Sequence, residues 1–120
     1  MAKLPSTDPR VFGPPIWATL HILSLNYPVQ PTVYEQRRWL RFMLDLAALL
    51  PCQHCGNHFR SMLRQSHGPL RSRDALVSFL LDCHNQVTAR TRPEARSFTL
   101  RDLQALYIQQ HPRLPLARVA

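Results

Sequence analysis

The sequence predicts an all-α protein, a four-helix bundle with a short fifth helix. Apolar residues recur at the three- and four-residue spacing of helices, and no stretch of any length shows the alternation typical of strands. Prolines separate the helical segments, so the loops between them are short. The chain has 120 residues, of which 45% are apolar and only three are glycine. These values are typical of one globular domain with a single hydrophobic core.

The first helix is expected over about residues 16–26, after an extended lead-in over residues 1–13. Pro14 and Pro15 would open this helix, because proline is tolerated in a first helical turn. Tyr27 would end it, since a residue that precedes proline is pushed out of helical space. The folded domain is predicted to cover residues 14–110 and to be followed by a flexible tail over residues 111–120.

The second helix is predicted from Thr32 to about Leu50, because Thr32 with Glu35 three residues later forms a capping-box pattern. Its apolar residues cover roughly 220° of the helix circumference, about twice what one core contact requires. They are Trp39, Leu40, Phe42, Met43, Leu44, Leu46, Ala47, Leu49 and Leu50. Such an arc fits a helix buried at the centre of the bundle. It also fits a helix whose second face packs against another copy of the chain, which we favour in so small a domain.

Three further helices complete the predicted bundle. A third helix runs over about residues 52–64, directly after Pro51. Ser72 starts a fourth, and Thr99 followed by Asp102 caps a short fifth helix that extends to about Tyr107. The fourth helix carries a stripe at helical spacing and is therefore expected to face the core. The stripe consists of Leu76, Phe79, Leu80, Cys83, His84 and Val87.

The chain is strongly basic, with a formal net charge of +8, and fourteen of its fifteen basic residues are arginine. A solvated basic surface would explain this, as would an anionic cofactor or an acidic partner. Nucleic acid is a weak alternative, because aromatic residues do not alternate with the arginines. The N-terminus lacks the apolar stretch of a secretion signal, and the longest apolar run, residues 42–50, is too short for a membrane span. We therefore expect a cytosol-like compartment.

The most informative feature is the pair Cys52 and Cys55, because the chain contains only one other cysteine, Cys83. In a cytosol-like compartment such a pair usually indicates metal or redox chemistry. A zinc-stabilised helical adaptor is one possibility, with Cys52, Cys55, His58 and either Cys83 or His84 as ligands. Cys52 and Cys55 have the paired spacing of zinc-finger ligands, but the remaining candidate ligands do not. A thioredoxin-like site would need a βαβ unit, which the helical patterns do not provide.

A redox dithiol that serves a bound cofactor is the third possibility. Pro51 places both cysteines on the first turn of a helix, where residues three apart share a face. The helix N-terminus favours a thiolate, which is the nucleophile in disulfide exchange. A flavin would supply the electron acceptor that a helical protein lacks, and no metal would be needed.

Three blocks of residues resemble the Erv/ALR-type sulfhydryl oxidases. The segment Phe12–His21 (FGPPIWATLH) is similar to the opening G-P-x-x-W-x-x-L-H signature, and a Y-P-x-x-P segment follows at residues 27–31. The segment Leu50–Cys55 (LPCQHC) resembles the family's redox centre, and Cys83–Thr88 (CHNQVT) resembles its H-N-x-V-N flavin clamp. The blocks occur in the family's order over about residues 12–107. The ending, residues 97–107, is most similar to that of the compact virus-encoded members.

The resemblance implies a helical bundle that holds FAD at one end and forms a homodimer through its first two helices. Cys52 would exchange disulfides with a dithiol protein substrate or a thioredoxin-like relay, and Cys55 would pass the electrons to the flavin. Molecular oxygen would then be reduced to hydrogen peroxide. For a virus-encoded protein the location would be the host cytoplasm or the virion. The implied cofactor-binding residues are Gly13, Trp17, His21, Cys55, Cys83, His84, Asn85, Val87, Thr88, Arg90 and Arg92.

The chain also departs from the family's pattern. Thr88 stands where the family usually has asparagine, and Pro93 stands where it tends to have lysine, so neighbouring arginines would contact the pyrophosphate. Cellular members carry a shuttle cysteine pair and a second structural disulfide, and this sequence contains neither. A substrate or relay protein would therefore have to reach Cys52 directly.

Overall fold

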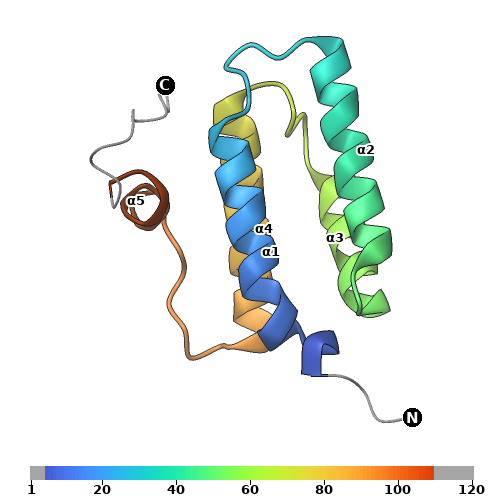
Figure 1. Ribbon diagram of the computed structural model, residues 1–120, viewed down its shortest axis with the longest axis vertical. Coiled ribbons are helices and arrows are strands. Elements are labelled where there is room, and N and C mark those ends of the chain that lie inside the picture. The colour runs from blue at the N-terminus through green and yellow to red at the C-terminus, as the bar shows by residue number, and fades with distance from the viewer. Residues whose placement is uncertain (1–4, 110–120) are drawn as a thin grey trace.

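Five α-helices form the fold in the computed structural model, which describes residues 5–109 (Figure 1). These residues contain no strand, so the all-α prediction is confirmed. A 3₁₀ turn (η1) precedes the helices, and a π-helical turn (η2) continues the last one. The predicted tail over residues 111–120 lies outside the described part of the chain. In chain order the elements are η1 Pro5–Thr7, α1 Pro9–Leu25, α2 Val33–Leu49, α3 Gln53–Gln65, α4 Arg73–Thr91, α5 Leu100–Gln104 and η2 Ala105–Gln109.

The predicted starts of three helices are confirmed by their caps. The Thr32 hydroxyl accepts the Glu35 backbone N–H, and the Glu35 carboxylate accepts the Thr32 N–H, which completes a capping box. Thr99 and Asp102 form the same reciprocal pair at the start of α5. The Ser72 hydroxyl accepts the Ala75 backbone N–H, and α4 begins at Arg73, directly after this cap.

The start of α1 differs from the prediction. An extended lead-in is wrong for residues 9–13, because α1 begins at Pro9. The Asp8 carboxylate caps the helix by accepting the Arg10 backbone N–H at 2.9 Å, and proline is well suited to the first turn. Pro14 and Pro15 therefore lie inside the helix, where each removes a backbone donor. Both are exposed, so water can hydrate the carbonyl groups that lose a partner.

The helices form two pairs, α1 with α4 and α2 with α3, and α5 lies beside the first pair (Figure 1). The main core joins all four long helices through Leu20, Met43, Phe59, Leu76 and Leu80, each 5% exposed or less. A second cluster of Leu25, Val77 and Leu103 buries α5 against α1 and α4. The arrangement confirms a four-helix bundle with a short fifth helix.

The backbones of α2 and α3 approach each other most closely at Gly56, one residue after Cys55. A Cβ atom at Gly56 would overlap the backbone carbonyl oxygen of Ala47 in α2. Both residues are buried. The space therefore admits only glycine, and this contact fixes the start of α3 against the end of α2.

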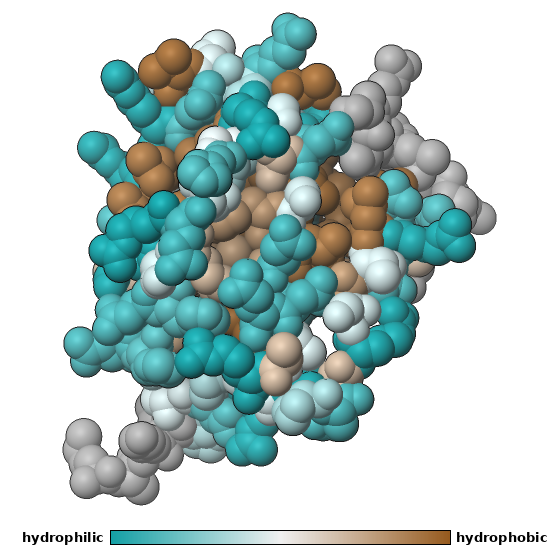
Figure 2. All heavy atoms as spheres, turned by 180° about the vertical axis from the view of Figure 1, so that it is seen from behind, coloured by the Kyte–Doolittle hydropathy of each residue, from teal (hydrophilic) through white to brown (hydrophobic). Residues whose placement is uncertain are grey.

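The broad apolar arc of α2 is only partly covered in the bundle. Met43 and Ala47 are buried, but Leu40 and Leu44 are each 40% exposed, and Leu23 of α1 is 43% exposed. Apolar side chains also gather in the upper part of the face seen in Figure 2, whereas its lower part is mainly hydrophilic. The alternative of a centrally buried α2 is therefore wrong. No helix within residues 5–109 is long and apolar enough to cross a bilayer.

Candidate functional site

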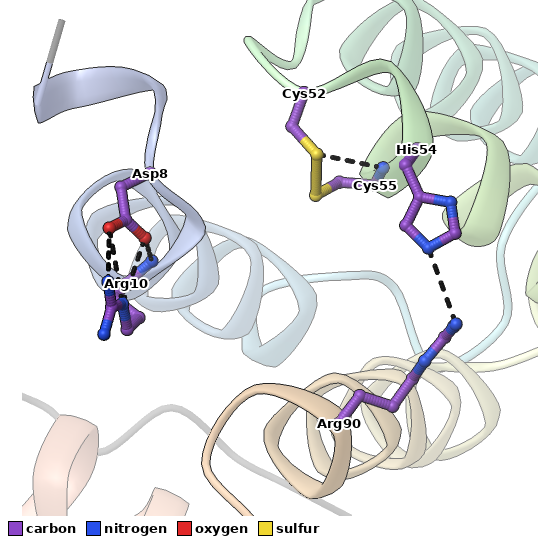
Figure 3. The surroundings of a disulfide bond; sticks show 6 residues. All are labelled: Asp8, Arg10, Cys52, His54, Cys55 and Arg90. Carbon is purple, nitrogen blue, oxygen red and sulfur yellow. Dashed lines mark hydrogen bonds and ion pairs between the residues drawn. A yellow bond between two sulfur atoms is a disulfide. The ribbon is translucent and has the colours of Figure 1, made fainter. Parts of the chain in front are cut away.

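Cys52 and Cys55 form a disulfide at the start of α3, with their Cα atoms 5.3 Å apart (Figure 3). Cys52 is the N-cap of the helix, and its Sγ accepts the Cys55 backbone N–H at 3.2 Å. The two sulfurs are thus bonded to each other. The described residues also contain no group of three or more His, Cys, Asp or Glu side chains placed to hold a metal. The zinc alternative therefore has no supporting ligand set.

The two cysteines line different spaces. Cys55 lines a small apolar cavity of about 60 Å³ between α1, α2, α3 and α4, together with Phe12, Trp17, Phe59 and Val87. Cys52 instead lines an outer hollow of about 370 Å³, where α2 ends and α3 begins. The disulfide therefore lies between an apolar cavity and a polar hollow.

A second cavity, of about 290 Å³, adjoins the first. Gly13, Trp17 and Val87 line both spaces, so the two meet around the Trp17 ring. Further lining comes from α4, from the segment before α5 and from η2. These residues are His84, Thr88, Arg92, Arg96, Phe98 and Tyr107. The combined space is apolar near Cys55 and carries arginine side chains at its far end.

Aromatic rings from α1 and α4 form the wall between the cavities and the core. Trp17 stacks on His84 with ring centroids 4.6 Å apart and the planes 8° from parallel. His21 Nε2 and His84 Nδ1 are 2.9 Å apart, so one imidazole donates a hydrogen bond and the other accepts it. Phe98 packs beside both histidines, with its ring centroid 6.0 Å from that of His21 and 5.6 Å from that of His84.

Both histidines are neutral at pH 7. Burial lowers the pKa of each to about 4. The adjacent His84 lowers the pKa of His21 further, because two charged imidazoles would repel each other, and the positive charge of Arg92 lowers the pKa of His84 further. His21 Nδ1 is buried and has no hydrogen-bond partner among the described residues. Because an unpaired buried polar atom is costly, it is a candidate contact for a polar group of a ligand.

Most of the predicted cofactor residues meet at these cavities. Gly13, Trp17, His84, Val87, Thr88 and Arg92 line the larger one, and Cys55 lines the smaller. His21 lies behind them and reaches the site through its contacts with His84 and Trp17.

Besides His21, three predicted residues do not line either cavity: Asn85, Cys83 and Arg90. The Asn85 side chain instead pairs with the backbone of Phe98, accepting its N–H at 2.7 Å and donating to its carbonyl oxygen at 2.8 Å. Cys83 is 1% exposed in the core, where burial raises its pKa to about 12 and keeps the thiol neutral. Arg90 points toward His54 beside the disulfide, at 3.5 Å (Figure 3). Cofactor contact by these residues stays a prediction.

Sequence reasoning gave no cofactor role to three residues that do line the larger cavity, Arg96, Phe98 and Tyr107. Arg96 is held by a bidentate ion pair with Asp102, at 2.8 and 2.9 Å. Helical periodicity could not predict that these three residues lie near Trp17 and His84. They belong to a separate segment, which packs beside the α1–α4 pair only in the folded protein.

These features define a class of helical thiol–disulfide proteins in which the two sulfurs line different spaces, one apolar and one polar. The family model of the Erv1/Alr family matches residues 14–107, so the chain belongs to the Erv1/Alr family. The resemblance seen in the sequence is thereby confirmed.

Curated relatives agree with this membership. The mitochondrial FAD-linked sulfhydryl oxidase ERV1 of Saccharomyces cerevisiae is 27% identical over 90 residues, which cover 75% of this chain and 48% of that protein. The FAD-linked sulfhydryl oxidase ERV1 of Arabidopsis thaliana is 31% identical over 94 residues, which cover 72% of this chain and 49% of that protein. Protein 347L of Invertebrate iridescent virus 6 is 29% identical, and the match covers 69% of this chain and 81% of the viral protein. The chain thus spans about half the length of the two cellular relatives.

The fold has a close match among solved structures. The crystal structure of the yeast Erv1 core superposes with a TM-score of 0.74 at 22% identity, covering 89% of each chain. This likeness shows that the two proteins share a fold.

Proposed function

We propose that this protein is a FAD-dependent thiol oxidase that forms disulfide bonds in protein substrates. The observation that carries the proposal is the position of the disulfide. Cys55 faces the internal cavity beside Trp17, and Cys52 faces the outer hollow. Electrons that enter from a substrate outside can thereby leave toward a cofactor inside. The names of the yeast and Arabidopsis relatives, both FAD-linked sulfhydryl oxidases, support the same reaction.

The residues present fit FAD. The space beside Cys55 is apolar and aromatic, as a flavin ring requires, and the larger cavity carries Arg92 for an anionic pyrophosphate. A Cβ atom at Gly13 would lie 3.9 Å from the nearest atom, on the Trp17 ring, so the packing of the helices does not require glycine there. The space that glycine leaves beside Trp17 is available to the cofactor. Gly13, Trp17, His84, Val87, Thr88 and Arg92 would hold the cofactor.

The two cysteines would act in sequence. A substrate thiolate attacks Cys52 Sγ, the Cys52–Cys55 bond breaks, and Cys55 is released as a thiolate toward the inner cavity. The second substrate thiolate then attacks the substrate sulfur of the mixed disulfide and releases Cys52. The α3 N-terminus and the Cys55 N–H stabilise the charge on Cys52, which makes it a good leaving group. Bound FAD would accept the electron pair and transfer it to oxygen, giving hydrogen peroxide.

We further propose that two copies associate through α1 and α2. The apolar side chains left uncovered there support this, with Ile22, Leu23, Leu40 and Leu44 each at least 40% exposed. Sedimentation should then give a molar mass near twice the 13.9 kDa of one chain. A monomer at micromolar concentration would contradict the dimer.

The partner is proposed to be a dithiol protein or a thioredoxin-like relay that reaches Cys52 directly. The sequence contains only three cysteines, and Cys83 is buried, so this chain holds no second pair to act as a shuttle. Location in a cytosol-like compartment stays a prediction.

A visible spectrum and an oxygen electrode test the main proposal. The purified protein should show flavin absorbance and should consume oxygen when dithiothreitol is added. Cys55→Ser should abolish oxygen uptake and leave the flavin bound, because the cavity keeps its other lining residues. A colourless wild-type protein that gains no activity with added FAD would contradict the oxidase function. Loss of flavin from Cys55→Ser would show that the cysteine holds the site together instead.

A further inference from the structure

The outer hollow beside Cys52 has two unlike walls. Its α2 side is apolar and consists of Ala47, Ala48 and Leu50, followed by Pro51. Its α3 side is polar and consists of Gln53, Asn57 and Arg60 around the Cys52 sulfur. Arg60 is the only charged residue in the lining.

The Arg60 charge is not neutralised within the described residues. Its Nη1 donates to the neutral Asn57 Oδ1 at 2.8 Å, which holds the guanidinium over the first turn of α3. The ion pairs found within residues 5–109 involve other arginines, Arg10 and Arg96. The guanidinium therefore has donors left for a carboxylate from another molecule.

The whole redox region shares this charge. Residues 46–73 contain no aspartate or glutamate, whereas they contain four arginines and three histidines. Arg90 from α4 also reaches His54 beside the disulfide (Figure 3). A substrate that approaches Cys52 therefore meets a positively charged surface, which attracts acidic segments and repels basic ones.

We propose that the outer hollow is the docking site for an extended acidic segment of the substrate protein, and that Arg60 selects for a carboxylate next to the substrate cysteine. The proposal rests on the proposed thiol–disulfide function. An apolar side chain of the segment would pack on Leu50 and Ala48 while its cysteine faces Cys52. The docked thiolate forms a bond to Cys52 Sγ as the Cys52–Cys55 bond breaks. The second substrate thiolate then displaces Cys52, so two electrons pass from the substrate to the cysteine pair.

Anaerobic disulfide exchange tests this specificity directly. The full chain with its oxidised Cys52–Cys55 pair is mixed with one of two reduced Cys-x-x-Cys peptides, flanked either by glutamates or by lysines. The rate of disulfide exchange is followed by alkylating the free thiols at successive times and measuring the products by mass spectrometry. At low salt the acidic peptide should react about tenfold faster than the basic one, and added salt should shrink the difference.

Two substitutions locate the effect in the hollow. Arg60→Gln should lower the acidic-to-basic rate ratio about three- to fivefold, the size expected for one surface ion pair. Arg60→Lys, which keeps the charge, should retain most of the ratio. Arg64→Gln is the matched control, because it removes the same charge from the same helix at a residue outside the hollow. Circular dichroism checks that each variant is folded.

The proposal fails if the two peptides react equally fast, or if Arg64→Gln lowers the ratio as much as Arg60→Gln does. The second result would mean that overall charge selects the substrate. Exchange with the cysteine pair needs no FAD, so these outcomes are independent of the oxidase function. Fast, charge-selective exchange without oxygen uptake would count against the oxidase function and leave the docking site supported.

Discussion

The α2–α3 side of the bundle and the α1–α4 side each contain a helical glycine, and the two glycines have opposite surroundings. At Gly56 a Cβ atom would overlap the Ala47 carbonyl oxygen, whereas at Gly13 it would make an ordinary contact with the Trp17 ring at 3.9 Å. The first glycine is needed for packing, because it lets α2 and α3 approach and fixes the turn that carries the disulfide. The second is not needed for packing and lines both cavities. One side of the bundle is thus closed to hold the reactive sulfurs, and the other is left open for a ligand.

The largest expected effect comes from closing the space at Gly56. Gly56→Ala should lower the free energy of unfolding by about 3 kcal/mol, because a backbone carbonyl cannot move aside and α2 and α3 must separate. Urea unfolding with the disulfide intact measures this, with Gly13→Ala as the matched control. A loss below about 0.5 kcal/mol would mean that the packing there is looser than the structure shows.

An intermediate effect is expected from pH on the α1–α4 side. Burial lowers the pKa of His21 and His84 to about 4, from an ordinary value of 6.5. Below pH 6.5 the unfolded chain therefore takes up protons that the folded chain does not. The free energy of unfolding should therefore fall as the pH is lowered from 6.5 to 4 and be constant, as far as these groups are concerned, above about pH 7.5.

Variants separate the histidine pair from other titrating groups. The pKa of His58 is also lowered, mainly by burial and further by Arg90 and His54, so it contributes with the same sign. The pKa of Asp102 is lowered by its bonds to Arg96 and Thr99, so its contribution is lost only at more acidic pH. His21→Phe should flatten much of the slope between pH 6.5 and 4, and His58→Gln should keep most of it. An unchanged slope in His21→Phe would contradict the neutral, buried pair.

Substitution of Gly13 should have the smallest effect on stability, but it should clearly lower the affinity for FAD. Gly13→Ala should leave the flavin-free protein as stable as before or up to about 1 kcal/mol more stable, because alanine favours the helix. The added methyl group would enter the space beside Trp17, so FAD affinity should fall about tenfold. Thermal unfolding without FAD and flavin titration measure the two quantities. Unchanged FAD affinity would remove the contrast between the two glycines.

Local features of the fold could be predicted because neighbouring residues form them. The Thr32–Glu35 and Thr99–Asp102 capping boxes need only residues three apart, and both are present. The start of α1 could not be placed correctly, because two local signals compete. Asp8 with Pro9 and the later Pro14–Pro15 pair can each open a helix. The earlier start places Phe12 and Gly13 on α1, where both line the inner cavity.

For the site, too, local sequence predicted some features and the fold decided others. The motif around His84 indicated which helix carries the site, but not which neighbours of His84 face it. Adjacent helical residues point about 100° apart, so Asn85 turns to the Phe98 backbone and holds the segment before α5. Arg90 likewise reaches His54 rather than the larger cavity.

The sequence by itself determined the helices, the cysteine pair at a helix start and the family, because spacing and capping are local and the motifs are distinctive. Only the tertiary structure decided that Cys55 lines the apolar cavity and Cys52 the hollow at the end of α2, and that a Cβ atom fits at Gly13 but not at Gly56. It also placed Arg60 beside the Cys52 sulfur. These properties depend on how the helices are rotated and how closely they pack, which non-local contacts set.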